Sequence, residues 1–81
     1  MDLQRKNLIR QVGQELLSAR KNAGISRISA AKSLNISEHT LYAYETGKRE
    51  IVTDLALQMA ALYNTTFENL TKYNELAKSI T

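Results

Sequence analysis

The side chains best suited to chemistry gather in one short stretch, in which Glu38 and His39 are adjacent and Tyr42 follows one helical turn later. Neighbouring side chains on a helix point about 100° apart, so Glu38 and His39 do not face each other as an acid–base pair. His39 is the only histidine and the chain has no cysteine, so the usual companion ligands of a zinc site are missing. The stretch is therefore suited to hydrogen bonding at a surface rather than to catalysis.

Other classes of site and of location are not indicated by the sequence. Neither a glycine-rich phosphate loop nor a Ser/His/Asp arrangement is apparent. We therefore expect no enzymatic activity, no cofactor and no metal. No apolar run approaches the length of a membrane span, and the first residues lack the apolar core of a signal peptide. The expected location is the cytoplasm, with no membrane partner.

The charges are distributed unevenly along the 81 residues. Residues 1–49 hold nine of the eleven Lys and Arg and four of the eight Asp and Glu, which gives this part a charge of +5. Residues 50–81 hold two basic and four acidic residues and carry −2. A basic half is compatible with a nucleic-acid partner, and equally with an ordinary solvated surface.

The elements that must position these side chains are predicted to be helices, because the chain has no proline and only three glycines. Apolar residues at helical spacing, with caps and stop signals between them, predict five helices at residues 3–22, 27–34, 38–46, 54–63 and 67–79. The predicted N-caps are Ser26, Ser37, Thr53 and Thr66, and the predicted stops are Gly24, Asn35, Gly47 and Asn64. The fourth helix is apolar almost all round, so we expect it to be central.

The second and third predicted helices are joined only by Asn35, Ile36 and Ser37. So tight a turn brings the two helices close together and needs a residue that tolerates positive φ, which Asn35 supplies. Ala31 is small enough for the close approach. The apolar residues placed to fill the wedge are Ala30, Leu34, Ile36, Leu41 and Tyr44. The pattern predicts a helix-turn-helix over residues 27–46.

With these features the chain resembles the lambda-repressor-like helix-turn-helix regulators, also called the XRE or Cro-like family. The resemblance runs from about Val12 to Leu70. It is carried by Ala19-Arg20-Lys21, Gly24-Ile25-Ser26, Ala31, Leu34-Asn35-Ile36-Ser37 and, most characteristically, Leu41-Tyr42-Ala43-Tyr44-Glu45-Thr46-Gly47-Lys48-Arg49. It implies a compact bundle of four or five helices whose third helix enters the major groove of double-stranded DNA.

The resemblance also implies roles for individual residues. Glu45 is expected to form a structural ion pair with Arg20. The residues expected at the DNA backbone are Arg27, Thr46, Lys48 and Arg49, and those expected to read bases are Glu38, His39, Tyr42 and Ala43. Glu38 departs from the family pattern, because a carboxylate near phosphates is repelled unless it finds a donor.

The apolar stripe of the last helix has two interpretations. Its residues are Phe67, Leu70, Tyr73, Ala77 and Ile80. They either pack on the first and fourth helices or form a dimer interface at helix 67–79.

The sequence thus predicts an all-α, five-helix, single-domain regulator over residues 1–81. We expect it to act as a repressor that binds a two-fold-symmetric operator as a homodimer. Two alternatives of the same fold are the antitoxin of a toxin–antitoxin pair and the controller protein of a restriction–modification system. A third is a protein-interaction module that has lost DNA binding, such as an adaptor or an anti-repressor. The protein partners considered beside DNA are a toxin and an anti-repressor.

Overall fold

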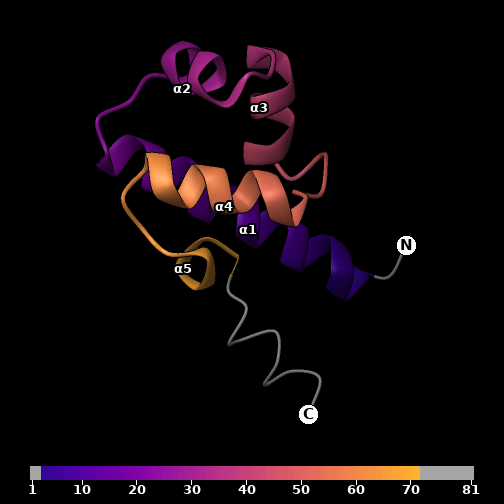
Figure 1. Cartoon of the computed structure of the whole chain (residues 1–81). Coiled ribbons are helices and arrows are strands. Elements are labelled where there is room, and N and C mark those ends of the chain that lie inside the picture. Colours follow the sequence, from indigo (N-terminus) through magenta and orange to yellow (C-terminus); the bar gives the residue numbers. More distant parts are fainter. Residues whose placement is uncertain (1–2, 72–81) are drawn as a thin grey trace.

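The computed structural model describes residues 3–71, and this part of the chain is all-helical (Figure 1). Its helices are α1 (Leu3–Asn22), α2 (Arg27–Leu34), α3 (Glu38–Glu45), α4 (Thr53–Leu62) and α5 (Phe67–Thr71). The first two match the predicted ranges, α3 ends one residue earlier than predicted, and α4 is shifted one residue towards the N-terminus. The remainder of the predicted helix 67–79 lies outside the described residues.

Side-chain caps begin three of the helices. The backbone N–H of Ser29 donates to Ser26 Oγ at 3.1 Å, and that of Thr40 donates to Ser37 Oγ at 3.0 Å. Thr66 Oγ1 likewise accepts from the Asn69 N–H at 3.1 Å. These contacts confirm three predicted caps, each of which satisfies an N–H that has no partner within its own helix.

The predicted cap at Thr53 is wrong. Thr53 is the first residue of α4, and Val52 occupies the cap position without a side-chain hydrogen bond. The carbonyl of Val52 accepts from the Ala56 N–H at 3.0 Å, so the first helical turn starts one residue earlier than the threonine suggested. Val52 has no side-chain oxygen to act as a cap, and its side chain is exposed.

The predicted stops all adopt the left-handed backbone conformation. Asn35 has φ of 57° and Asn64 has φ of 56°, while Gly24 and Gly47 have φ of 72° and 76°. The turn at Asn35 lets α3 follow α2 after three intervening residues, which is the geometry that a helix-turn-helix requires.

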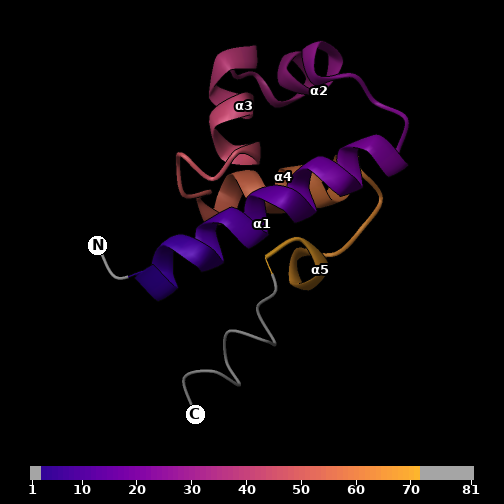
Figure 2. The same cartoon turned by 180° about the vertical axis from the view of Figure 1, so that it is seen from behind.

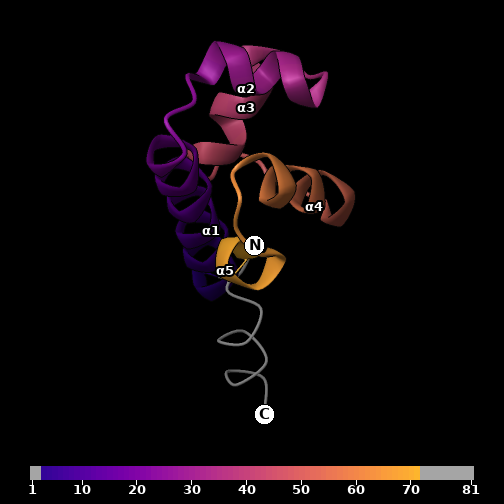
Figure 3. The same cartoon turned by 60° about the vertical axis from the view of Figure 1, so that its left-hand side comes forward.

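The long helix α1 packs mainly against two of the other helices. It contacts α3 and α5, while α2 contacts α3 and α4, and α4 contacts α5. Figure 3 shows α2 and α3 at one end of the molecule and α5 at the other. The buried apolar cluster between them consists of Leu16, Ala30, Ala31, Leu34, Leu41, Tyr44, Leu55, Met59, Ala60, Tyr63 and Leu70. The predicted wedge is therefore confirmed, with Ile36 partly buried against it.

The expectation that α4 would be surrounded by protein is wrong for one of its sides. Leu55, Ala56, Met59 and Ala60 are buried, but Leu57 is 52% exposed. The helices α2 and α5, which contact α4, leave the side of α4 at Leu57 open to solvent although this residue is apolar.

Gly13 marks a place where α1 and α3 approach closely. A Cβ atom at this position would lie 2.7 Å from the carbonyl oxygen of Tyr44 and 2.8 Å from that of Glu45. The backbone of α1 therefore lies directly against the C-terminal end of α3. This contact sets the position of α3 on the rest of the fold.

Candidate nucleic-acid interface

A buried ion pair fixes α3 to α1. Arg20 donates from Nε to Glu45 Oε2 at 2.7 Å and from Nη2 to Glu45 Oε1 at 3.2 Å. Its Nη1 donates to the carbonyl oxygen of Ile25 at 2.9 Å. One guanidinium thus joins α1, the segment that leads into α2, and the end of α3, so the helix-turn-helix is held at two points.

The environment of this pair keeps Arg20 charged. The Glu45 side chain is only 1% exposed and that of Arg20 is 7% exposed. The hydrogen bond to Glu45 raises the pKa of Arg20, against the opposing effect of burial. The carboxylate and guanidinium therefore neutralise each other where both are largely shielded from water.

Arg27 is a second partner of the same carboxylate. Its Nε lies 3.2 Å from Glu45 Oε1, and its guanidinium carbon lies 5.1 Å from the centre of the Tyr42 ring. The sequence indicated a phosphate contact for Arg27 and did not indicate this link to Glu45. The structure thus holds the guanidinium of Arg27 against Glu45 and Tyr42, although the side chain is 33% exposed.

Tyr42 brings together two of the residues expected at the DNA backbone. Tyr42 is an exposed residue of α3, and Lys48 Nζ lies 5.9 Å from the centre of its ring. Because Arg27 also lies over this ring, we call Arg27, Tyr42 and Lys48 the Tyr42 cluster. Cations at this distance are attracted by the electron-rich face of the ring.

The other predicted base-reading residues lie along the same helix. Glu38 and His39 are exposed, and Ala43 is half-buried. Tyr42 follows Glu38 by four residues and Ala43 follows His39 by four, so the four side chains form two adjacent rows on α3. The exposed rows begin at the N-terminal end of the helix, which is the end farthest from the ion pair at Glu45.

The loop after α3 is held by its own backbone. The N–H groups of Lys48 and Arg49 donate to the carbonyl of Ala43 at 3.0 and 3.2 Å. The hydroxyl of Thr46 donates to the Tyr42 carbonyl at 2.9 Å, so its hydrogen is already used within the protein. The loop is therefore rigid, and its side chains are the groups available to a partner.

Arg49 is turned away from the Tyr42 cluster. Its guanidinium carbon lies 5.4 Å from the centre of the ring of Tyr44, the residue predicted and found in the core. With Arg5 and Glu50 it lines a hollow of about 320 Å³ between the start of α1 and α5. The residues expected at the DNA backbone thus divide into two groups, with Lys48 in one and Arg49 in the other.

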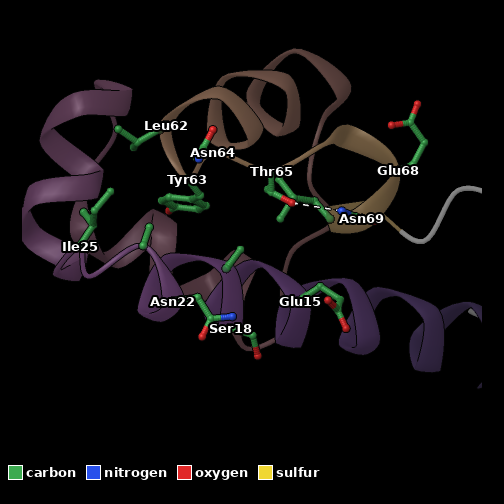
Figure 4. Close-up of a pocket in the computed structure, with 13 residues that line it drawn as sticks. Glu15, Ser18, Asn22, Ile25, Leu62, Tyr63, Asn64, Thr65, Glu68 and Asn69 are labelled. Carbon is green, nitrogen blue, oxygen red and sulfur yellow. Dashed lines mark hydrogen bonds between the residues drawn. The ribbon is translucent and has the colours of Figure 1, made fainter.

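A second hollow, of about 790 Å³, lies between the C-terminal half of α1 and the junction of α4 with α5 (Figure 4). Polar side chains such as Asn22 and Asn69 line it, and none of the predicted DNA-contacting residues does. Tyr63 forms part of its wall and is 4% exposed, and its hydroxyl has no hydrogen-bond partner within residues 3–71. Burial raises the pKa of Tyr63 to about 12, and the charge of Glu45 adds to this effect.

The stripe expected at a dimer interface is only partly described. Phe67 is half-buried, whereas Leu70 is 1% exposed and belongs to the core of the chain itself. Leu70 therefore has no surface to offer a second copy. The positions of Tyr73, Ala77 and Ile80 lie outside the described residues.

The described part of the chain contains neither a metal-binding cluster nor a helix able to span a membrane. Between residues 3 and 71, no three His, Cys, Asp or Glu side chains are grouped so that they could hold a metal ion. Over the same residues, no helix combines the length and the apolar character needed to cross a membrane.

Comparison with known proteins identifies the family. The helix-turn-helix family matches residues 16–70. The chain is 36% identical over 67 residues to the HTH-type transcriptional regulator ImmR of Bacillus subtilis (strain 168), an alignment that covers 83% of the chain and 53% of ImmR. The chain thus spans about half the length of this relative. No solved structure matches the chain. Since the family match covers well over half of the chain, the protein belongs to the XRE-like helix-turn-helix family of transcriptional regulators.

Proposed function

We propose that the protein binds double-stranded DNA through α3 and regulates transcription, acting as a repressor when it occupies a promoter. The observation that carries the proposal is the attachment of α3 through Glu45 to Arg20, which leaves Glu38, His39 and Tyr42 exposed. A recognition helix must be held rigidly at one side and present polar side chains at the other. The name of the relative, an HTH-type transcriptional regulator, supports the same function.

The exposed rows of α3 offer groups that discriminate between bases in the major groove. The carboxylate of Glu38 can accept from the exocyclic amine of cytosine, and the methyl group of Ala43 can touch that of thymine. His39 can donate to the edge of a purine. Tyr42 reaches either a base or a phosphate, and its place between α3 and two cations favours a contact at the edge of the groove.

Contacts to the DNA backbone are assigned to Arg27, Lys48, Arg49 and Thr46. The Tyr42 cluster holds Arg27 and Lys48 beside the exposed rows, so these two cations stand where the strand passes the recognition helix. Arg49 must swing off the Tyr44 ring to reach a phosphate, and the hydroxyl of Thr46 must leave the carbonyl of Tyr42. We therefore rank Lys48 above Arg49 and Thr46 as a phosphate ligand, whereas Arg27 would have to leave Glu45 to bind a phosphate through its Nε.

We further propose that the active form is a homodimer on a two-fold-symmetric operator. One helix of eight residues reads only a few base pairs. Two copies with α3 helices about 34 Å apart would read two half-sites one turn apart on the same face of the duplex. Because the proposed target is double-stranded DNA, we also propose the cytoplasm as the place of action.

Selection of bound duplexes from a randomised DNA pool by the purified chain tests the function directly. We expect enrichment of a two-fold-symmetric site whose half-sites are about one helical turn apart. Enrichment of nothing by a chain that circular dichroism shows to be folded would overturn autonomous DNA recognition. That result would favour the interaction module or an antitoxin that needs its partner.

A further inference from the structure

The first turns of α1 carry charges that a helix does not favour at this end. Between Leu3 and Arg10 there are three basic residues and no acidic one, and the first turn has no acidic residue. The N-terminal end of a helix carries partial positive charge and is stabilised by acidic side chains. Basic residues that are unfavourable for the helix at this end point to a functional role. A bound external anion would offset their unfavourable interaction with the positive end of the helix.

The loop that follows α3 packs directly on these turns. A Cβ atom at Gly47 would lie 2.8 Å from the Cα atom of Arg10. Further along the loop, Glu50 Oε2 accepts from Arg5 Nη2 at 2.5 Å. In Figures 1 and 2 the start of α1 and the connection from α3 to α4 lie on the same side of the molecule. The basic turns are therefore neighbours of the loop that carries Lys48.

The three basic residues are not equivalent. Arg5 pairs with Glu50 and lines the hollow beside Arg49. Arg10 lies on the side of α1 that meets Gly47, and Lys6 precedes it by four residues on that same side. Both are exposed, and no ion pair joins either of them to another residue in the described range 3–71. Within the described residues they are thus two cations without an ion-pair partner, beside a candidate phosphate-binding loop.

We propose that Lys6 and Arg10 bind backbone phosphates of the DNA and extend the contact surface along α1. Both residues precede the part of the chain that the family matches, residues 16–70. The inference rests on the proposed DNA binding and adds a sequence-independent contact to it. The turns of α1 that carry Lys6 and Arg10 lie along the loop that carries Lys48. The two cations would therefore bind phosphates of the same DNA strand as Lys48, one or two phosphates further along.

The test is the salt dependence of binding to a fluorescent mixed-sequence duplex, measured by anisotropy with the full chain. Lys6→Gln and Arg10→Gln each remove one cation. The matched control is Lys21→Gln, which removes one exposed cation in the last turn of the same helix. We expect each of the first two substitutions to reduce the slope of log K against log salt by about 0.9, and the control to leave it unchanged.

The outcomes separate this inference from the function on which it rests. If the wild-type chain binds the duplex but Lys6→Gln and Arg10→Gln have the slope of Lys21→Gln, the α1 contact is wrong and DNA binding stands. If the wild-type chain binds no duplex, both proposals fail. Arg10→Lys keeps the charge and should retain the wild-type slope; a slope as low as that of Arg10→Gln would assign the effect to packing against Gly47 and overturn the phosphate contact.

Discussion

At the scale of single residues, one buried carboxylate organises the helix-turn-helix. Glu45 receives hydrogen bonds from Arg20 and Arg27, and its side chain is 1% exposed. Arg20 is buried with it, whereas Arg27 is 33% exposed. The two arginines therefore depend on Glu45 to different degrees. Removal of the carboxylate would leave a buried guanidinium without a counter-charge, while removal of Arg27 would leave the pair intact.

Glu45→Gln keeps the shape of the side chain and removes its charge. We expect a loss of about 3–5 kcal/mol in the free energy of unfolding, as for other buried pairs that lose one partner. Urea denaturation followed by circular dichroism measures the loss. Arg27→Ala is the control and should lose less than about 1 kcal/mol, because this contact is partly screened by solvent. Equal losses in the two variants would contradict the central role of Glu45.

Tyr63 predicts a dependence of stability on alkaline pH. Its pKa is raised from 10.0 to about 12 in the folded chain, so folding favours the protonated phenol. Stability is unaffected by this group below the unfolded pKa, and falls by about 1.4 kcal/mol per pH unit between the two values.

Tyr63→Phe should remove that fall. The variant should also be at least as stable as the wild type at neutral pH, since its phenylalanine buries no hydroxyl that lacks a partner. Thermal unfolding of both chains from pH 7 to 11 tests both expectations. Parallel curves above pH 10 would mean that the Tyr63 phenol ionises freely in the folded chain.

His39 and Lys48 should have separable effects on DNA binding. Lys48→Ala is expected to weaken binding to every duplex similarly, because a phosphate contact carries no sequence information. His39→Ala should change the preferred sequence, with a difference of about 1–3 kcal/mol at one position of the site. Repeating the duplex selection with both variants distinguishes them. If His39→Ala kept the wild-type preference, the base-reading role of His39 would be lost.

At the scale of elements, the seam between α1 and α3 depends on a residue without a side chain. Gly13→Ala would place a Cβ atom 2.7 Å from the Tyr44 carbonyl oxygen, which belongs to rigid backbone. Alanine favours a helix by about 1 kcal/mol over glycine, but we expect a net loss of about 1–3 kcal/mol through overpacking.

Chemical denaturation of Gly13→Ala checks this balance. Gly24→Ala is a useful comparison, because a Cβ atom there meets nothing within 4 Å and only the positive φ of 72° opposes it. A Gly13→Ala chain more stable than the wild type would show that α3 can shift away without loss.

The helices could largely be predicted from the sequence because capping and stop residues close to each end determine where the helix begins and ends. Ser26, Ser37, Asn35 and Asn64 act within a few residues of their own positions, so each signal can be found without the fold. The prediction of Thr53 as an N-cap was wrong because a threonine able to cap a helix can also be a residue of its first turn.

Features that depend on distant contacts could not be predicted in this way. The exposure of Leu57 follows from which helices cover α4, and the second partner of Glu45 follows from where α2 lies on α3. Gly13 gave one usable signal, since a glycine within a predicted helix is unfavourable unless something approaches it closely. For the residues proposed to contact DNA, family resemblance supplied the positions, but the separation of Arg49 from Lys48 required the structure.

At the scale of the whole molecule, the proposed operator symmetry predicts how many chains bind. Sedimentation of the chain with its selected duplex should give a complex of two chains per duplex. The same duplex with one half-site scrambled should bind more weakly and take up one chain. A complex of one chain on the intact site would contradict the homodimer, whatever the sequence of that site.

The packing of α1 against both α3 and α5 has a consequence for synthesis on the ribosome. The two helices of the helix-turn-helix are neighbours in the chain and can meet as soon as both have emerged. The apolar side of α1 around Leu16, although made before α3 and α5, stays incompletely covered until Leu70 and Thr71 have emerged. The growing chain therefore exposes one side of α1 until residues 70–71 have emerged, and the protein core closes only then.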